Sequence, residues 1–157
     1  MIKANATITK LEQALAANAT LAVKIFSDGS REITLISEFF PFRPYAMQDE
    51  KTEKIFMVNL PLIAGRVKEK ISKPGEGLGF LSKKAGSFSG VEQRTVQLWT
   101  ERGLISPDIA DTSGTGQRRL YGVLNCIEIG IIRSLAQERL SFKLIREIMA
   151  YLRAQGM

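Results

Sequence analysis

The stretch SGVEQRTVQLWTERGLISP, from Ser89 to Pro107, contains a tight turn, a short helix and a stop signal within nineteen residues. Gly90 interrupts the preceding segment, residues 92–102 have the spacing of a helix, and Gly103 is the residue type that ends helices in the left-handed conformation. A first short helix is expected over residues 79–88, with these apolar positions: Phe80, Leu81, Ala85 and Phe88. Two short helices joined by a glycine-containing turn form a helix-turn-helix, which is the motif that this stretch predicts.

The second of these helices has an apolar side and a polar side. Val91, Val96 and Trp99 are expected to be buried. The remaining surface has short or medium polar side chains near the helix N-terminus: Gln93, Arg94, Gln97 and Thr100. A recognition helix places such residues against base edges in the major groove, where Gln pairs with adenine and Arg with guanine or phosphate. These residues alone leave DNA binding and a generic helical hairpin as open alternatives.

The residues that follow predict an extended excursion and two further helices. LISPDIADTSGTGQRRLY, residues 104–121, is rich in Gly, Ser and Thr. VLNCIEIGIIRSLAQERL, residues 123–140, predicts an amphipathic helix with one aligned apolar row: Leu124, Ile127, Ile131 and Leu135. Ser141 is expected to cap a last helix. Its inward side is predicted to hold five residues: Leu144, Ile145, Ile148, Met149 and Leu152.

The N-terminal part predicts a small α+β unit. Thr9 and Glu12 have the spacing of a capping box at the start of a helix over residues 9–18. The inward face of that helix is expected to hold Ile8, Leu11 and Leu15.

A β-hairpin is predicted next in this part, because Asp28-Gly29 separates two strand-like runs. Leu21, Val23 and Ile25 alternate along the first run, and Ile33 and Leu35 along the second. IFMV, residues 55–58, is a candidate third strand. Asn59 is expected to cap a helix with one apolar row: Ile63, Val67 and Ile71. This sheet is a candidate surface for self-association or ligand sensing, or simply closes a small core.

SKPGEGLG, residues 72–79, is the clearest candidate linker. We therefore expect a small α+β domain over residues 1–71, a linker over 72–78 and a mainly helical domain over 79–157. The overall class predicted is α+β.

Composition narrows the function. The formal net charge is +6 and the pI is about 9.6, which favours polyanionic partners. The chain has one cysteine, Cys126, and no histidine, so an internal disulfide and histidine-based catalysis are excluded. We expect no metal site, cofactor or enzymatic activity, and we expect Cys126 to be a small buried hydrophobe. No apolar run is long enough for a bilayer and no signal peptide is evident, so we predict a cytoplasmic protein without a membrane partner.

The stretch from Ser89 to Pro107 resembles the DNA-binding domain of the MerR family of transcriptional regulators. The matching positions are Gly90-Val91, Arg94-Thr95, Leu98-Trp99, Gly103-Leu104-Ile105 and Pro107. GTGQRRLY, residues 114–121, is similar to the family's wing, and FKLIREI, residues 142–148, is similar to its closing helix. The resemblance extends over about residues 79–155.

The resemblance implies a winged helix-turn-helix that binds double-stranded DNA as a homodimer and contacts RNA polymerase. By position it assigns DNA contacts to Arg94, Thr95, Gln97, Arg118, Arg119 and Tyr121. Two further candidate DNA contacts are Gln93, from the polar side of the helix, and Trp99. Trp99 has the alternative of packing under the wing, and Arg118-Arg119 that of solvated charge. Gln97 and Leu98 depart from the arginine and tyrosine that are common there.

The family also has a long dimerisation helix and an effector domain, and residues 1–71 are expected to replace one or both of them. Two other functions fit the same residues. One is a small architectural or excisionase-type DNA-binding protein, and the other is a protein–protein adaptor.

Overall fold

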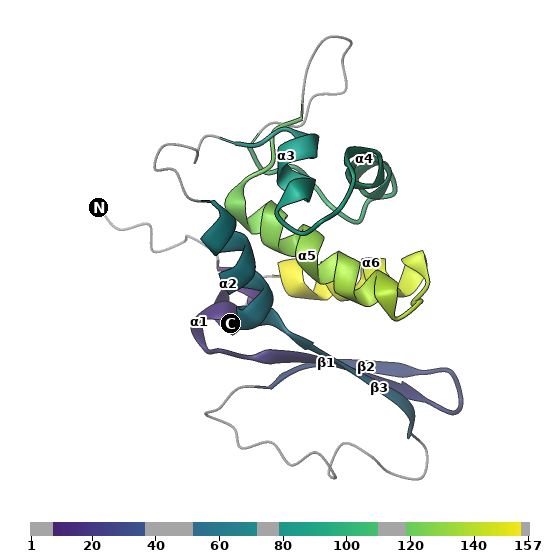
Figure 1. Ribbon diagram of the computed structural model, residues 1–157. Coiled ribbons are helices and arrows are strands. Elements are labelled where there is room, and N and C mark those ends of the chain that lie inside the picture. The colour runs from purple at the N-terminus through teal and green to yellow at the C-terminus, as the bar shows by residue number, and fades with distance from the viewer. Residues whose placement is uncertain (1–7, 37–51, 72–78, 110–118, 155–157) are drawn as a thin grey trace. The chain divides into compact units, whose positions relative to one another are not determined.

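The computed structural model describes residues 8–36, 52–71, 79–109 and 119–154 (Figure 1). The chain forms two compact units, one of Met1–Pro61 with Ala150–Met157 and the other of Leu62–Met149. Helices and a three-stranded antiparallel sheet are both present, so the α+β class is confirmed. The predicted linker at 72–78 lies outside the described residues, and the division at that position stays a prediction.

The first unit begins with helix α1, Lys10–Ala16, which starts as predicted. Thr9 Oγ1 accepts a hydrogen bond from Glu12 N at 3.1 Å, and Glu12 Oε1 accepts one from Thr9 N at 3.0 Å. Leu11 and Ala14 are buried. The prediction that Ile8 lies on the inward face of this helix was wrong. Its side chain is 50% exposed, because Ile8 precedes the N-cap and is not on the helix.

The sheet has the order β2-β1-β3, with β1 Thr20–Phe26, β2 Arg31–Ile36 and β3 Thr52–Asn59. Gly29 adopts φ +91° in the hairpin, as Asp28-Gly29 predicted. Hydrogen bonds from Ser30 to the Asp28 carboxylate lower the pKa of Asp28. The simple alternation predicted for the first strand was incomplete. Ala22 is buried beside Leu21 and Val23, because β1 is the central strand and Ala22 is a small side chain flanked by β2 and β3.

Helix α2, Leu60–Lys70, follows β3 directly. Val67 is 1% exposed and Ala64 is 4% exposed, so they form its inner side. Ile63 is only half-buried, and Ile71 follows the end of the helix. Asn59 stands immediately before the helix, and its capping bond stays a prediction.

The remaining helices are α3 Ser82–Ser87, α4 Gln93–Glu101, α5 Val123–Gln137 and α6 Phe142–Arg153. Helices α3 and α4 begin later and end earlier than the patterns suggested, whereas α5 begins as predicted and ends earlier. Phe80 forms an isolated β-bridge with Tyr121 instead of starting a helix, and Leu81 is 39% exposed. Phe80 and Leu81 were both predicted as apolar positions of a helix over residues 79–88. Both predictions were wrong, because residues 79–81 are extended and only the following residues are helical.

Helix α5 is the centre of the second unit, and Figure 1 shows it passing beneath α3. Every residue from Asn125 to Ile132 is buried, so α5 is covered on all sides along these turns. The prediction of one aligned apolar row was therefore too narrow. The start of α6 is confirmed, since Ser141 Oγ accepts a hydrogen bond from Leu144 N at 3.1 Å. Its predicted inward residues are each at most 4% exposed: Leu144, Ile145, Ile148, Met149 and Leu152.

Within the described residues, no helix combines the length and apolarity needed to cross a bilayer.

Candidate nucleic-acid interface

The turn between α3 and α4 is held by backbone hydrogen bonds to the end of α3. Ser89 N and Val91 N both donate to Gly86 O, at 3.0 and 2.9 Å. Gly90 adopts φ +70°, a conformation that favours glycine. A Cβ built on Gly86 would lie 2.3 Å from Val91 O and 2.8 Å from Val96 Cγ2. The two helices can therefore approach this closely only because residue 86 has no side chain.

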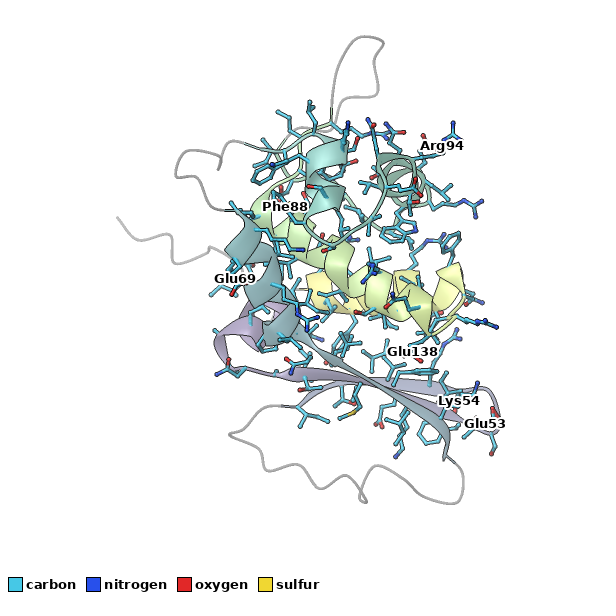
Figure 2. The ribbon with its side chains drawn as sticks, viewed as in Figure 1. Glu53, Lys54, Glu69, Phe88, Arg94 and Glu138 are labelled. Atoms are coloured by element: carbon cyan, nitrogen blue, oxygen red, sulfur yellow. The ribbon has the colours of Figure 1, made fainter. Side chains whose placement is uncertain are left out.

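Helix α4 has the two faces that its sequence predicted, except that Thr100 is half-buried and its hydroxyl lies against that of the buried Tyr121. Val96 and Trp99 are 0% and 5% exposed, and Val91, just before the helix, is 8% exposed. Its outward positions are exposed: Gln93, Arg94, Gln97 and Leu98. Thr95 is half-buried. Figure 2 shows Arg94 on the outer side of α4. The polar residues near the helix N-terminus thus form a surface that is accessible to a partner.

Trp99 and Tyr121 are interior side chains. Tyr121 is fully buried, and its hydroxyl lies 2.8 Å from Thr100 Oγ1. Because the Thr100 hydroxyl donates to Val96 O at 2.9 Å, the tyrosine is the donor in this pair. The backbones of Tyr121 and Phe80 exchange two hydrogen bonds of 2.8 Å. Tyr121 therefore links residues 119–121 both to the start of the motif and to α4.

A polar cluster holds the segment that leaves α4 against the start of α5. Asn125, 3% exposed, accepts hydrogen bonds from Asp108 N at 2.8 Å and Gly122 N at 3.1 Å. Its amide donates to Ser106 O and Glu128 Oε1, both at 3.0 Å. Asp108 Oδ1 also accepts from Gly122 N at 2.8 Å. This cluster fixes both ends of the excursion whose residues 110–118 lie outside the described part of the chain.

The C-terminal end of α4 is also fixed. Gly103 adopts φ +79°, as predicted for a helix end, and Leu104 N donates to Trp99 O at 2.9 Å. Arg146 of α6 donates from Nε and Nη2 to Arg102 O, at 3.1 and 3.0 Å. The guanidinium of Arg102 in turn lies 5.1 Å from the ring centroid of Phe142. Contacts from α6 therefore hold the end of α4 in a defined position.

Cys126 is confirmed as a buried small hydrophobe, with 0% exposure. Burial, together with the negative charge of Asp108, raises the pKa of its thiol to about 12. A thiol that stays protonated is a poor nucleophile and a poor metal ligand.

The predicted site residues therefore fall into three groups. Gln93, Arg94 and Gln97 share the exposed face of α4, and Thr95 is at its margin. Trp99 and Tyr121 are buried beneath that helix. Arg119 is half-buried, and Arg118 lies outside the described residues.

Sequence reasoning missed three supporting features: Gly86, the Asn125 cluster and Arg146. A signal existed for two of them. Gly86 is a glycine in a very short helix, and Asn125 and Glu128 are polar residues three apart in an apolar run. Arg146 is one exposed arginine among many, and its role depends on a carbonyl 44 residues earlier.

These elements define a helix-turn-helix protein, with α3 and α4 as the two helices of the motif. Residues 82–152 match the family described as MerR HTH family regulatory protein. This part of the chain is accordingly similar to the MerR helix-turn-helix regulators, as the resemblance predicted.

Curated relatives include uncharacterized HTH-type transcriptional regulators of Mycobacterium tuberculosis and Mycobacterium bovis. Each is 28% identical over 85 residues, which are 54% of this chain and 38% of the relative. The matched region thus spans well under half the length of these relatives. No solved structure matches the chain significantly.

Proposed function

We propose that the protein is a sequence-specific DNA-binding transcriptional regulator. The observation behind the proposal is the pair of opposite faces on α4. Val96 and Trp99 anchor the helix, while Gln93, Arg94 and Gln97 are exposed near its N-terminus. In this proposal α4 enters the major groove and these side chains contact base edges and phosphates.

The rest of the interface is part of the same proposal. In the same proposal, residues 114–121 serve as the wing that the resemblance implies, with Arg118 and Arg119 neutralising backbone phosphates. Trp99 and Tyr121 act indirectly by positioning α4, because buried side chains have little surface to offer to a duplex.

The protein acts in the cytoplasm as a homodimer on a palindromic operator, and it contacts RNA polymerase. Residues 1–71 supply self-association or sensing.

A mobility-shift assay with native promoter DNA, repeated over a series of salt concentrations, tests the proposal. Arg94→Ala is compared with Lys143→Ala, which removes one positive charge from an exposed position of α6. Loss of an arginine that contacts a base costs about 1–3 kcal/mol, or roughly 5- to 150-fold in affinity. The DNA affinity of Lys143→Ala should stay within about twofold of that of the wild type, because the salt-dependent part of the binding free energy is shared among many charges.

Two results would contradict the proposal. One is the absence of a salt-dependent shift with the wild-type protein. The other is an equal effect of the two variants, which would reduce α4 to a generic charged surface. An adaptor would keep its protein partner in both variants and bind no DNA.

A further inference from the structure

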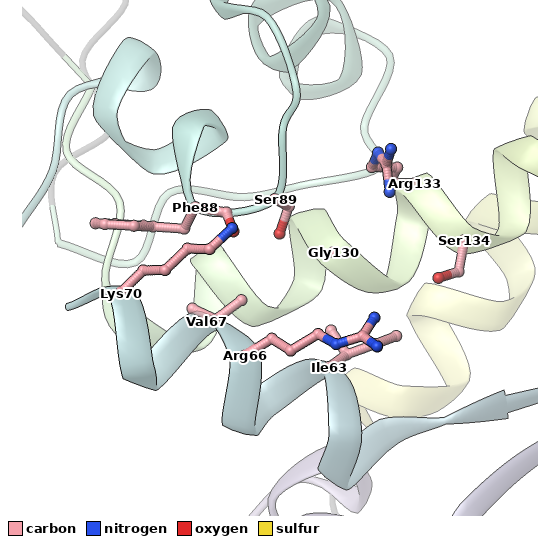
Figure 3. Close-up of a pocket in the computed structure, with 9 residues that line it drawn as sticks. All are labelled: Ile63, Arg66, Val67, Lys70, Phe88, Ser89, Gly130, Arg133 and Ser134. Atoms are coloured by element: carbon pink, nitrogen blue, oxygen red, sulfur yellow. The ribbon is translucent and has the colours of Figure 1, made fainter.

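A groove lies within the Leu62–Met149 unit, between α2, the turn after α3 and the middle of α5 (Figure 3). Its volume is about 160 Å³. The lining residues come from these three segments: Ile63, Arg66, Val67, Lys70, Phe88, Ser89, Gly130, Arg133 and Ser134. The groove is smaller than the ~300–1,000 Å³ typical of sites for drug-sized ligands, so it suits a small ligand.

The charge of the groove is positive. Arg66, Lys70 and Arg133 line it, and no acidic side chain does so among the described residues. Lys70 Nζ donates a hydrogen bond to Phe88 O at 3.2 Å. In the described part of the chain, no carboxylate forms an ion pair with Arg66 or Arg133. Among the residues that the structure describes, the guanidinium groups of Arg66 and Arg133 therefore have no neutralising partner.

Hydrogen-bond donors other than the cations are also present. Ser89 and Ser134 are half-buried, and the described residues provide no hydrogen-bond partner for either hydroxyl. Figure 3 shows the Ser89 hydroxyl and the Lys70 ammonium together at one end of the groove, near Phe88. Donors of this kind complement the oxygens of an anion.

The shape of the groove depends on Gly130 of α5. A Cβ at this position would lie 2.7 Å from Ile63 Cγ2 and 2.9 Å from Ser89 Oγ. The absence of a side chain lets α2 and the turn approach α5 from two sides. The cations of α2 and α5 and the hydroxyl of Ser89 are thereby brought to one surface.

We propose that this groove binds the phosphate group of a small molecule. Arginine guanidinium groups bind phosphate oxygens in bidentate fashion, and lysine adds a point charge. The site is distinct from the proposed DNA-binding face, since Arg94 is on the outer side of α4 (Figure 2) whereas the groove is lined by α2, the turn after α3 and α5. Phosphate binding does not depend on the proposed DNA binding, although Phe88 and Ser89 belong to the turn that leads into α4.

Calorimetric titration of the full chain with inorganic phosphate, at constant ionic strength and without DNA, tests the proposal. Glycerol 3-phosphate and glycerol serve as paired organic probes. The variants are Arg66→Ala and Arg133→Ala, and the matched control is Lys68→Ala, an exposed cation of the same helix outside the groove. We expect saturable binding of both phosphates but not of glycerol. Each groove variant should weaken phosphate binding at least about 10-fold, and the control variant should weaken it by less than about twofold.

Arg66→Lys is the conservative variant and should retain part of the affinity, because one positive charge remains. Unchanged melting temperatures without phosphate would show that the variants fold. The proposal is overturned if phosphate does not bind saturably, if the control weakens binding as much as the groove variants, or if the groove variants leave it unchanged. It is also overturned if the groove variants weaken only DNA binding, since the groove would then hold the backbone of a duplex.

Discussion

Gly86→Ala is the substitution that most directly tests how α3 and α4 are joined. The added Cβ would lie 2.3 Å from the carbonyl oxygen of Val91, well inside the 3.0 Å that real Cβ atoms essentially never cross. The contact is with backbone, so it cannot be relieved by a rotamer change. Overpacking of this kind costs about 1–3 kcal/mol, and we expect a value near the upper end. Alanine regains up to ~1 kcal/mol in helix propensity, which leaves a net loss of about 2 kcal/mol.

Gly65→Ala is the matched control, because Gly65 is also a helical glycine but has open space where its Cβ would be. That substitution should stabilise the protein by about 0.5–1 kcal/mol through helix propensity alone. The two alanine variants should therefore differ by about 3 kcal/mol in free energy of unfolding, a sum of these two estimates.

Urea denaturation followed by circular dichroism measures this difference, with the slope checked for each variant. A Gly86→Ala protein as stable as the wild type would refute the packing argument for the turn. A destabilised Gly65→Ala protein would refute the propensity argument used for the control.

Three further predictions concern stability. Asn125→Ala should lower the free energy of unfolding by about 3 kcal/mol, because it removes four hydrogen bonds from a buried cluster. The control Gln137→Ala, at the exposed end of the same helix, should change the free energy of unfolding by less than about 0.5 kcal/mol. Equal effects of the two variants in thermal melts would contradict this prediction. Thr9→Ala should cost about 1 kcal/mol through loss of the capping box, and a melting curve unchanged from the wild type would exclude that contribution. Cys126 should resist alkylation at pH 8 until the protein unfolds. The thiol pKa of about 12 in the folded state exceeds the ordinary 9.0, so the folded protein keeps the proton to a higher pH than the unfolded chain does. The free energy of unfolding of the wild type should therefore fall between about pH 9 and 12 relative to that of Cys126→Ala. Parallel pH profiles of stability for the two proteins would disprove this coupling between thiol ionisation and folding.

Local features were predictable because they depend on residues close together in sequence. The capping box at Thr9, the Asp28-Gly29 hairpin and the left-handed Gly103 each involve a few neighbouring residues. The exposed and buried faces of α4 follow from the 3.6-residue period. These features therefore appeared in the sequence at nearly their observed positions.

Features set by distant partners could not be predicted. The burial of Tyr121 depends on its bridge to Phe80, 41 residues earlier. The burial of the polar side chain of Asn125 is explained by the hydrogen bonds that it accepts from Asp108 N, 17 residues away, and from Gly122 N. The all-round burial of α5 depends on elements packed against several of its sides, which an apolar row on one face does not reveal. The contact between DNA and the segment that contains residues 110–118 stays a prediction. The same holds for the proposed phosphate contact of Arg118.

The nine residues of α4 set a limit on how much DNA one copy of the motif can read. At about 1.5 Å per residue the helix is roughly 13 Å long, which corresponds to about four base pairs at ~3.4 Å each. A four-base-pair sequence recurs about once in every 256 positions of random DNA, far too often to identify one promoter among ~10⁶ or more competing sites. Two copies on adjacent half-sites would square that selectivity, so the shortness of this helix is itself a reason to expect recognition by paired motifs.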